Sequence, residues 1–229
     1  MPYSICVSPE GRGLPTQLSL FDEKQVAGHK RLVDAIHSKG SLVAAQLYHA
    51  GRQASEAITG LDPLAPSAIP CGILQNHPKE ITHEQMDRIK EQFRQAARWS
   101  IEAGYDIVEV HFAHGYLLHS FMSTHTNHRT DEYGGSAENR ARFPKNIIRK
   151  VREATGPDFI VGYRLSASEG VEGGLTPEDT AAFAKSIEND VDYINVAAGI
   201  YETMEQYIIP PNYEPHAMVV PFAKVIKEQ

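Results

Sequence analysis

Apolar residues along the chain form two kinds of pattern. Short runs in which consecutive residues are apolar predict strands that are buried on both faces, because neighbouring side chains of a strand point to opposite faces. Between these runs, apolar residues recur every three or four positions, as on one face of a helix. Strands are predicted at 41–48, 105–111, 159–165 and 192–197, and residues 3–7 predict the end of another. Helices are predicted over 22–38 and 82–103, from 136, from 176 and over 219–229.

Local signals mark several helix ends. Thr82 and Gln85 form a capping box, and Pro177 occupies the first helical position after Thr176. The proline-rich segment 59–79 predicts a long irregular loop, and residues 119–135 predict a polar connection. Strands and helices that alternate at this spacing indicate parallel βαβ units.

Each complete strand carries a polar residue near its C-terminal end, namely Gln46, His111, Arg164 and Asn195. In a (β/α)8 barrel these ends form the active-site face. A flavodoxin-like open sheet is the alternative, but it usually has a glycine-rich phosphate loop after a strand, which this sequence lacks. We therefore predict an α/β fold of the TIM-barrel type, with residues 1–229 in one domain and no linker.

The segment from Val108 to Tyr116 combines a buried strand with candidate chemistry. Because strand side chains alternate, Val108 and Val110 should face the helices while Glu109 and His111 face the other side. Buried charge there must be paired or used. His114 and Tyr116 follow within one turn, and two imidazoles with a phenol can hold an oxyanion and deliver a proton. For any one of these residues alone, a structural role in the core is the favoured interpretation, but all of them together at the end of one strand favour a functional site.

Composition narrows the possible functions. The formal net charge of -7 argues against a nucleic-acid partner. Cys6 and Cys71 lie far apart and in no C-x-x-C pair, so we expect a reducing compartment and no zinc or iron–sulfur ligands within the chain. No apolar run has membrane-spanning length, and the N-terminus does not resemble a signal peptide. These features favour a cytoplasmic enzyme without a membrane partner.

Four segments carry a family resemblance that covers nearly the whole chain. They are 46–52 (QLYHAGR), 109–116 (EVHFAHGY), 127–143 (NHRTDEYGGSAENRARF) and 162–168 (GYRLSAS). Together they resemble the old yellow enzyme family of flavin-dependent oxidoreductases. Residues 124–127 (THTN) are most similar to the branch that contains 2-enoate and dienoyl-CoA reductases.

The resemblance implies an eight-stranded barrel that holds FMN and uses NADH or NADPH as reductant. Gln46 resembles the residue that hydrogen-bonds the flavin pyrimidine edge. Arg164 resembles the arginine near flavin N1 and O2, where a cation stabilises the reduced ring. Residues 129, 131 and 133 resemble a structural signature without a chemical role.

The resemblance also implies an ene-reductase, which passes hydride through the flavin to an activated C=C bond. His111 and His114 resemble the pair that binds the substrate carbonyl or carboxylate. Tyr116 resembles the tyrosine that protonates the alkene carbon opposite the hydride. The implied substrate is a small enoate, enone or enoyl-CoA.

The chain departs from the family in extent. Strands three to six of the barrel should be complete, the second partial, and the first, seventh and eighth lacking, so we expect a partial barrel truncated at both ends. Because the family's phosphate-binding loops follow those later strands, we expect impaired activity and weak FMN binding by this chain alone. A complementing chain or a homo-oligomer would restore the missing side.

Two further functions remain open. A zinc-dependent barrel hydrolase could use residues 111, 114, 125 and 128, which are all histidines. Inward-facing Gln46 and Arg164 suit an anionic ring better than a metal cation, and this disfavours zinc. The other alternative is a non-catalytic barrel fragment that folds only with a partner, because missing strands leave open sheet edges.

Overall fold

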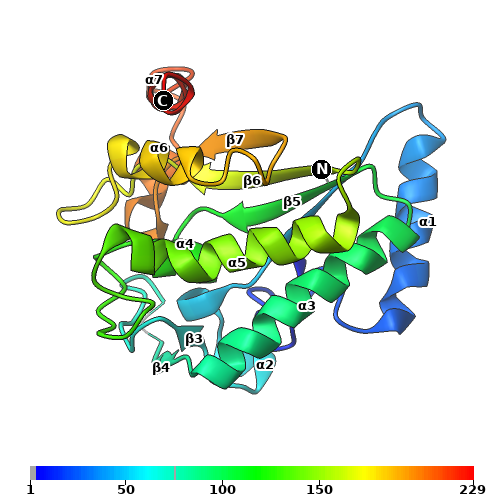
Figure 1. Ribbon diagram of the computed structural model, residues 1–229, viewed down its shortest axis with the longest axis horizontal. Coiled ribbons are helices and arrows are strands. Elements are labelled where there is room, and N and C mark those ends of the chain that lie inside the picture. Colours follow the sequence, from blue (N-terminus) through cyan, green and yellow to red (C-terminus); the bar gives the residue numbers. More distant parts are fainter. Residues whose placement is uncertain (1–3, 75) are drawn as a thin grey trace.

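A five-stranded parallel sheet forms the centre of the computed structural model, which describes residues 4–74 and 76–229. The strands lie in the order β1-β2-β5-β6-β7, and every pair is parallel. Their bounds are Ile5–Cys6 for β1, Ala44–Tyr48 for β2, Ile107–Phe112 for β5, Ile160–Ser166 for β6 and Tyr193–Ala197 for β7. The prediction of parallel strands separated by helices is confirmed (Figure 1). The predicted strand end at 3–7 includes Tyr3, which lies outside the described residues.

The strand register places polar residues in two layers on one side of the sheet. Gln46 pairs with Glu109, which pairs with Gly162, which pairs with Tyr193. Two positions further along, His111 pairs with Arg164 and Arg164 with Asn195. Because side chains alternate along each strand, the residues between these layers face the opposite side.

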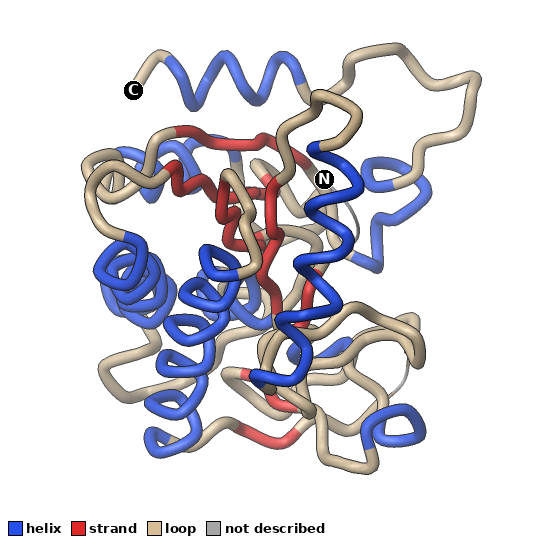
Figure 2. The backbone as a smooth tube through the Cα atoms, turned by 90° about the vertical axis from the view of Figure 1, so that its right-hand side faces the viewer, coloured by secondary structure: helices blue, strands red, loops and turns tan. Residues whose placement is uncertain are grey.

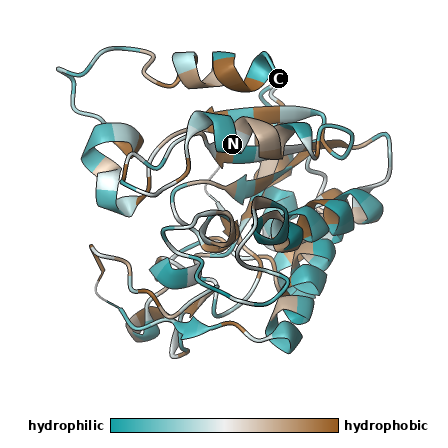
Figure 3. Cartoon of the chain, turned by 60° about the vertical axis from the view of Figure 1, so that its left-hand side comes forward, coloured by the Kyte–Doolittle hydropathy of each residue, from teal (hydrophilic) through white to brown (hydrophobic). Residues whose placement is uncertain are grey.

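Helices cover the apolar face of the sheet. The longer ones are α1 (Val26–His37), α3 (His83–Glu102), α5 (Ala137–Thr155), α6 (Pro177–Lys185) and α7 (Val220–Lys227). In Figures 1 and 2 the strands lie among these helices, with α3 and α5 side by side. Val108 and Val110 are fully buried in the same core cluster as Phe93 of α3 and Ile147 of α5. Figure 3 shows the polar faces of α3 and α5 turned outward.

The predicted helix starts have the expected caps. Asp22 accepts from the backbone N–H of Lys24 and begins a 3-10 turn (η1, Glu23–Gln25) that leads into α1. Thr82 and Thr176 each form a capping box, and Ser136 accepts from the backbone N–H of Asn139. Each of these caps satisfies backbone N–H groups that have no partner within the helix.

Two connections contain structure that the sequence pattern did not predict. Segment 59–79, in which Gln75 lies outside the described residues, contributes to a two-stranded parallel sheet of β3 (Leu64–Ala65) and β4 (Lys79–Glu80). The short helix α2 (Glu56–Thr59) ends where that segment begins. Residues 119–122, predicted as polar connection, belong to the fully buried helix α4 (Leu117–Met122). These elements were missed because two to six residues are too few to show a period.

Short turns at the C-terminal ends of the strands complete the framework. The turn η2 (Gly51–Gln53) follows β2, while η3 (Tyr201–Thr203) and the π-helical turn η4 (Met204–Ile208) follow β7. Within the described residues, none of the helices combines the length and apolar character needed to cross a membrane.

Gly162 is expected to be required for sheet packing. A Cβ atom at this position would overlap the ring of Tyr193 on the neighbouring strand. Gly162→Ala should therefore lower the free energy of unfolding by about 1–3 kcal/mol, as overpacking does. Urea unfolding measures it. Gly28→Ala, on the exposed face of α1 with no close neighbour, should instead leave stability unchanged or raise it by up to ~1 kcal/mol. Equal effects of the two substitutions would contradict the packing argument.

Candidate active site

A cavity of about 420 Å³ opens at the C-terminal ends of β2, β5 and β6. The loops that follow β1 and β7 complete its wall. All five residues predicted to act on cofactor or substrate line it, namely Gln46, His111, His114, Tyr116 and Arg164. The remaining lining residues are Ser4, Gly13, Leu14, Gln17, Tyr48 and Tyr201. The sequence prediction that these strand ends form one site is thus matched by their positions.

His114 sits on a left-handed turn directly after β5. Its φ angle is 64°, which is unusual for a residue other than glycine, and Gly115 follows with φ 78°. The backbone N–H of His114 donates to Ser166 Oγ at 3.0 Å, and that hydroxyl donates to the carbonyl of Gly199 at 2.9 Å. Anchoring to β6 and to the loop after β7 offsets the strain of the turn.

The two cavity imidazoles are neutral at ordinary pH. Their ring centroids are 5.3 Å apart. Burial, then the neighbouring His114 and Arg164, lowers the pKa of His111 well below its usual range. Burial and the charge of Arg164 lower the pKa of His114 to about 3. The Nδ1 atom of His111 accepts a hydrogen bond from the backbone N–H of Ala113 at 3.1 Å, so the neutral ring carries its proton on Nε2.

Tyr116 is held among aromatic rings at the start of α4. Its ring makes edge contacts with Tyr48 and His111, with centroids 5.0 and 4.9 Å away. Its hydroxyl lies 3.2 Å from that of Tyr201, in the loop after β7. Sequence reasoning missed Tyr201 as a site residue. Its place four residues after the end of β7 is the signal that could have found it.

A fully buried carboxylate contacts the cavity residue Gln46. Glu109 Oε1 accepts from Gln46 Nε2 at 2.6 Å. Its Oε2 accepts from the Tyr193 hydroxyl at 2.9 Å and from Asn195 Nδ2 at 3.2 Å. Burial, together with the charge and hydrogen bond of Glu109, raises the pKa of Tyr193 well above its usual range. The inward-facing carboxylate of Glu109 is therefore hydrogen-bonded, as expected for a buried charged side chain.

Arg164 differs from Glu109 because one of its hydrogen-bonding groups lacks an acceptor among the described residues. Its Nε is buried and has no hydrogen-bond partner in the part of the chain that the structure describes. A buried guanidinium N–H without an acceptor is unfavourable unless a ligand supplies one. This atom points to a ligand with an acceptor or a negative charge beside β6.

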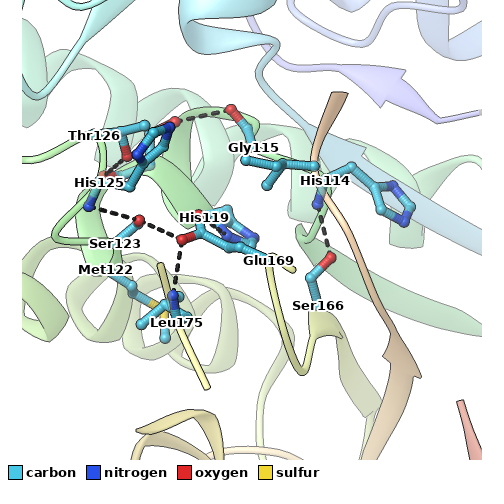
Figure 4. A network of polar contacts seen from close by, with 12 residues as sticks. His114, Gly115, His119, Met122, Ser123, His125, Thr126, Ser166, Glu169 and Leu175 are labelled. Carbon is cyan, nitrogen blue, oxygen red and sulfur yellow. Dashed lines mark hydrogen bonds and ion pairs between the residues drawn. The ribbon is translucent and has the colours of Figure 1, made fainter. Parts of the chain in front are cut away.

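A second buried network lies close to the two cavity histidines. Figure 4 shows the side chains of His119, from α4, and Glu169, from the loop after β6, pointing toward each other. His119 Nε2 lies 2.8 Å from Glu169 Oε1, and Glu169 Oε2 accepts from Ser123 Oγ at 2.6 Å and from the backbone N–H of Leu175 at 2.8 Å. Burial alone would raise the pKa of Glu169, but these contacts, mainly that of His119, lower it to about 2. The network ties α4 to the loop after β6.

The four histidines of the zinc hypothesis do not assemble. His111 and His114 line the cavity, whereas His128 is exposed and its Nε2 contacts the carbonyl of Thr124. Within residues 4–74 and 76–229, the one group of three side chains whose ligand atoms lie within 4.8 Å of one another is His83, Asp131 and Glu132, at the surface. This arrangement does not support a zinc-dependent hydrolase.

Comparison with known sequences adds a family to this geometry. Residues 3–220 match the sequence profile of the NADH:flavin oxidoreductase / NADH oxidase family. An NADH oxidase of Thermoanaerobacter brockii is 45% identical over 208 residues, which is 90% of this chain and 32% of that protein. An NADPH dehydrogenase of Bacillus velezensis is 41% identical over 228 residues, which is 99% of this chain and 64% of that protein.

Solved structures give the same result. A 2-naphthoyl-CoA reductase in complex with 2-naphthoyl-CoA superposes with a TM-score of 0.92 at 29% identity, over 98% of this chain and 36% of that one. Morphinone reductase superposes with a TM-score of 0.80 at 31% identity, over 98% of this chain and 63% of that one. These neighbours are TIM-barrel enzymes, so the parallel sheet is part of such a barrel. The chain spans between about a third and just under two thirds of the length of these relatives.

Neutral cavity histidines should make the fold sensitive to acid. An unfolded histidine binds a proton near pH 6.5, whereas the folded site resists protonation to about pH 3. The stability from His114 is therefore full above about pH 6.5 and falls as the pH drops toward 3. Between about pH 8 and about pH 5 the loss from His114 should be about 2 kcal/mol.

Urea unfolding of His114→Asn at both pH values measures this contribution. The variant should lose about 2 kcal/mol less than wild type over that interval. His77→Asn, at an exposed position, is the control and should follow wild type. An unchanged pH dependence in His114→Asn would show that the imidazole is not held neutral.

Proposed function

Because the chain belongs to the NADH:flavin oxidoreductase / NADH oxidase family, we propose that its cavity is the flavin and substrate site of an ene-reductase. FMN, when bound, would carry hydride from NADH or NADPH to the β-carbon of an activated alkene. The proposal rests on one observation above all, which is that Gln46, His111, His114, Tyr116 and Arg164 converge on one cavity.

The residues at the floor fit the ring of a flavin. The cavity volume of about 420 Å³ lies within the usual range for small-molecule sites. Gln46 offers a side-chain amide to a hydrogen-bonding ring edge. The unpartnered Nε of Arg164 offers a donor and a positive charge, which would stabilise the electron-rich reduced ring for a Coulombic reason. These two side chains would hold the ring.

The residues around β5 fit an α,β-unsaturated carbonyl compound. Neutral His111 and His114 can donate hydrogen bonds to a carbonyl oxygen and stabilise the negative charge that develops there. Tyr116 can then give its phenolic proton to the α-carbon. Two structural relatives are named as reductases of 2-naphthoyl-CoA and of morphinone, which are both conjugated carbonyl compounds. These names support an enone, enoate or enoyl-CoA substrate.

A second candidate is a barrel fragment that works with another chain. Within the described sheet, β7 pairs on one side only, whereas the outer side of β1 is bonded to the backbone of residues 18–20. The chain also covers no more than about two thirds of its relatives. A complementing chain or a second copy could supply the remaining strands by edge pairing. Sedimentation of the purified chain distinguishes a monomer from either assembly.

Tyr116→Phe tests the proposed proton donor in the FMN-loaded protein. Reduction of the alkene should slow by about 10²–10⁴-fold, as expected for loss of a general acid. Reduction of the flavin by NAD(P)H should change little, because the phenol takes no part in that step. Stopped-flow measurement of the two half-reactions separates them.

A matched control is Tyr163→Phe, on the outer face of β6. Its hydroxyl is buried without a hydrogen-bond partner among the described residues, so its removal should leave both half-reactions intact. If Tyr116→Phe slows both half-reactions equally, the role assigned to Tyr116 is wrong.

A further inference from the structure

Glu109 has no chemical role in the function proposed above, yet it is fully buried and hydrogen-bonded to the cavity residue Gln46. Both of its oxygens accept hydrogen bonds, and all the donors are uncharged groups of Gln46, Tyr193 and Asn195. Burying a carboxylate among neutral donors is unfavourable unless these bonds are well formed. Such an arrangement directly behind a cavity residue calls for a functional explanation.

The neighbouring strand is shaped to permit this arrangement. Gly162 lies in register between Glu109 and Tyr193. Because Gly162 has no side chain, the ring of Tyr193 passes over it and brings its hydroxyl to Glu109 Oε2. Three strands therefore cooperate to hold one carboxylate in place beside Gln46 on the fourth.

The carboxylate fixes which way the amide of Gln46 points. Glu109 Oε1 accepts a hydrogen bond from Gln46 Nε2 at 2.6 Å, so the NH₂ group of this amide faces Glu109. The carbonyl oxygen of the same amide is left for the cavity that Gln46 lines. Without this constraint, a glutamine amide could turn over with almost no change in shape and present a donor instead.

We propose that Glu109 is a positioning residue that makes Gln46 a hydrogen-bond acceptor toward the cavity, and so selects a ring edge with an N–H donor. This inference rests on the proposed flavin function, in which that donor is the imide N3–H of the pyrimidine edge. The carboxylate acts through Gln46 and does not itself touch the ligand.

Discrimination between FMN and its N3-methyl derivative tests the selection, because the derivative lacks the N–H. Wild type should bind FMN at least about tenfold more tightly, the equivalent of one hydrogen bond. Glu109→Leu removes the acceptor that orients Gln46, so this ratio should fall below about threefold. Glu109→Gln, which can offer either an oxygen or a nitrogen to Gln46, should give an intermediate ratio.

Tyr193→Phe is the matched control, because it removes a donor to Glu109 but leaves the contact with Gln46. Its affinity for both ligands should fall together, which leaves the ratio near that of wild type. A purely structural role of Glu109 would likewise weaken both ligands equally. An unchanged ratio in Glu109→Leu and Glu109→Gln would therefore overturn the inference, and if Glu109→Leu does not fold, the ratio for Glu109→Gln decides.

Side-chain amide exchange tests the positioning without any flavin. In NMR spectra of the ¹⁵N-labelled chain, the NH₂ protons of Gln46 should exchange much more slowly than those of the exposed Gln206. Substitution of Glu109 should remove that protection. Exchange of Gln46 as fast as that of Gln206 in wild type would overturn the inference. If wild type binds neither FMN nor its N3-methyl derivative while the Gln46 amide is protected from exchange, the proposed flavin function is wrong. The positioning of Gln46 by Glu109 would then still be supported.

Discussion

The parallel register of β2, β5, β6 and β7 is the constraint on which the rest of the structure depends. It places Glu109 beside Gln46 and His111 beside Arg164, while Val108 and Val110 pack against the helices. A slip of one residue would turn the charged side chains into the apolar core and the valines into the cavity. The same strand register therefore forms the apolar core on one face of the sheet and places the cavity side chains on the other.

The cavity is lined by several hydrogen-bond donors, and the charged and titratable side chains around it are each held in a defined state. Both oxygens of Glu109 accept hydrogen bonds from uncharged side chains, whereas the imidazoles are kept neutral by burial and by Arg164. That leaves Arg164 as the cation beside the cavity, with an N–H that lacks an acceptor among the described residues. Such a surface favours a ligand that is rich in acceptors and gains negative charge during its reaction, which describes both a flavin ring and an enolate.

Much of the fold could be predicted because its signals are local. Apolar runs, helical stripes and caps such as Thr82 need only a few neighbouring residues to be recognised. The helix α4 escaped prediction because it has six residues, and its role depends on His119 contacting Glu169 from a distant loop. The five site residues could be predicted because they follow strand ends or lie in family motifs.

Other parts of the site depend on contacts that no local pattern contains. Tyr201 joins the cavity through a loop more than eighty residues from Tyr116. The partners of Glu109 lie on strands before and after it, and Gly162 matters only because Tyr193 lies next to it in the sheet. Such relations appear only once the strand register is known.

The most direct test of the flavin site is a titration of the ¹⁵N-labelled chain with lumiflavin, which is the ring alone. Ring binding should shift backbone amide signals at the C-terminal ends of β2, β5 and β6, around Gln46, His111 and Arg164. Arg164→Ala should weaken that binding at least about tenfold, because it removes the cation and its free donor. Shifts concentrated elsewhere, or equal affinity in Arg164→Ala, would contradict the account.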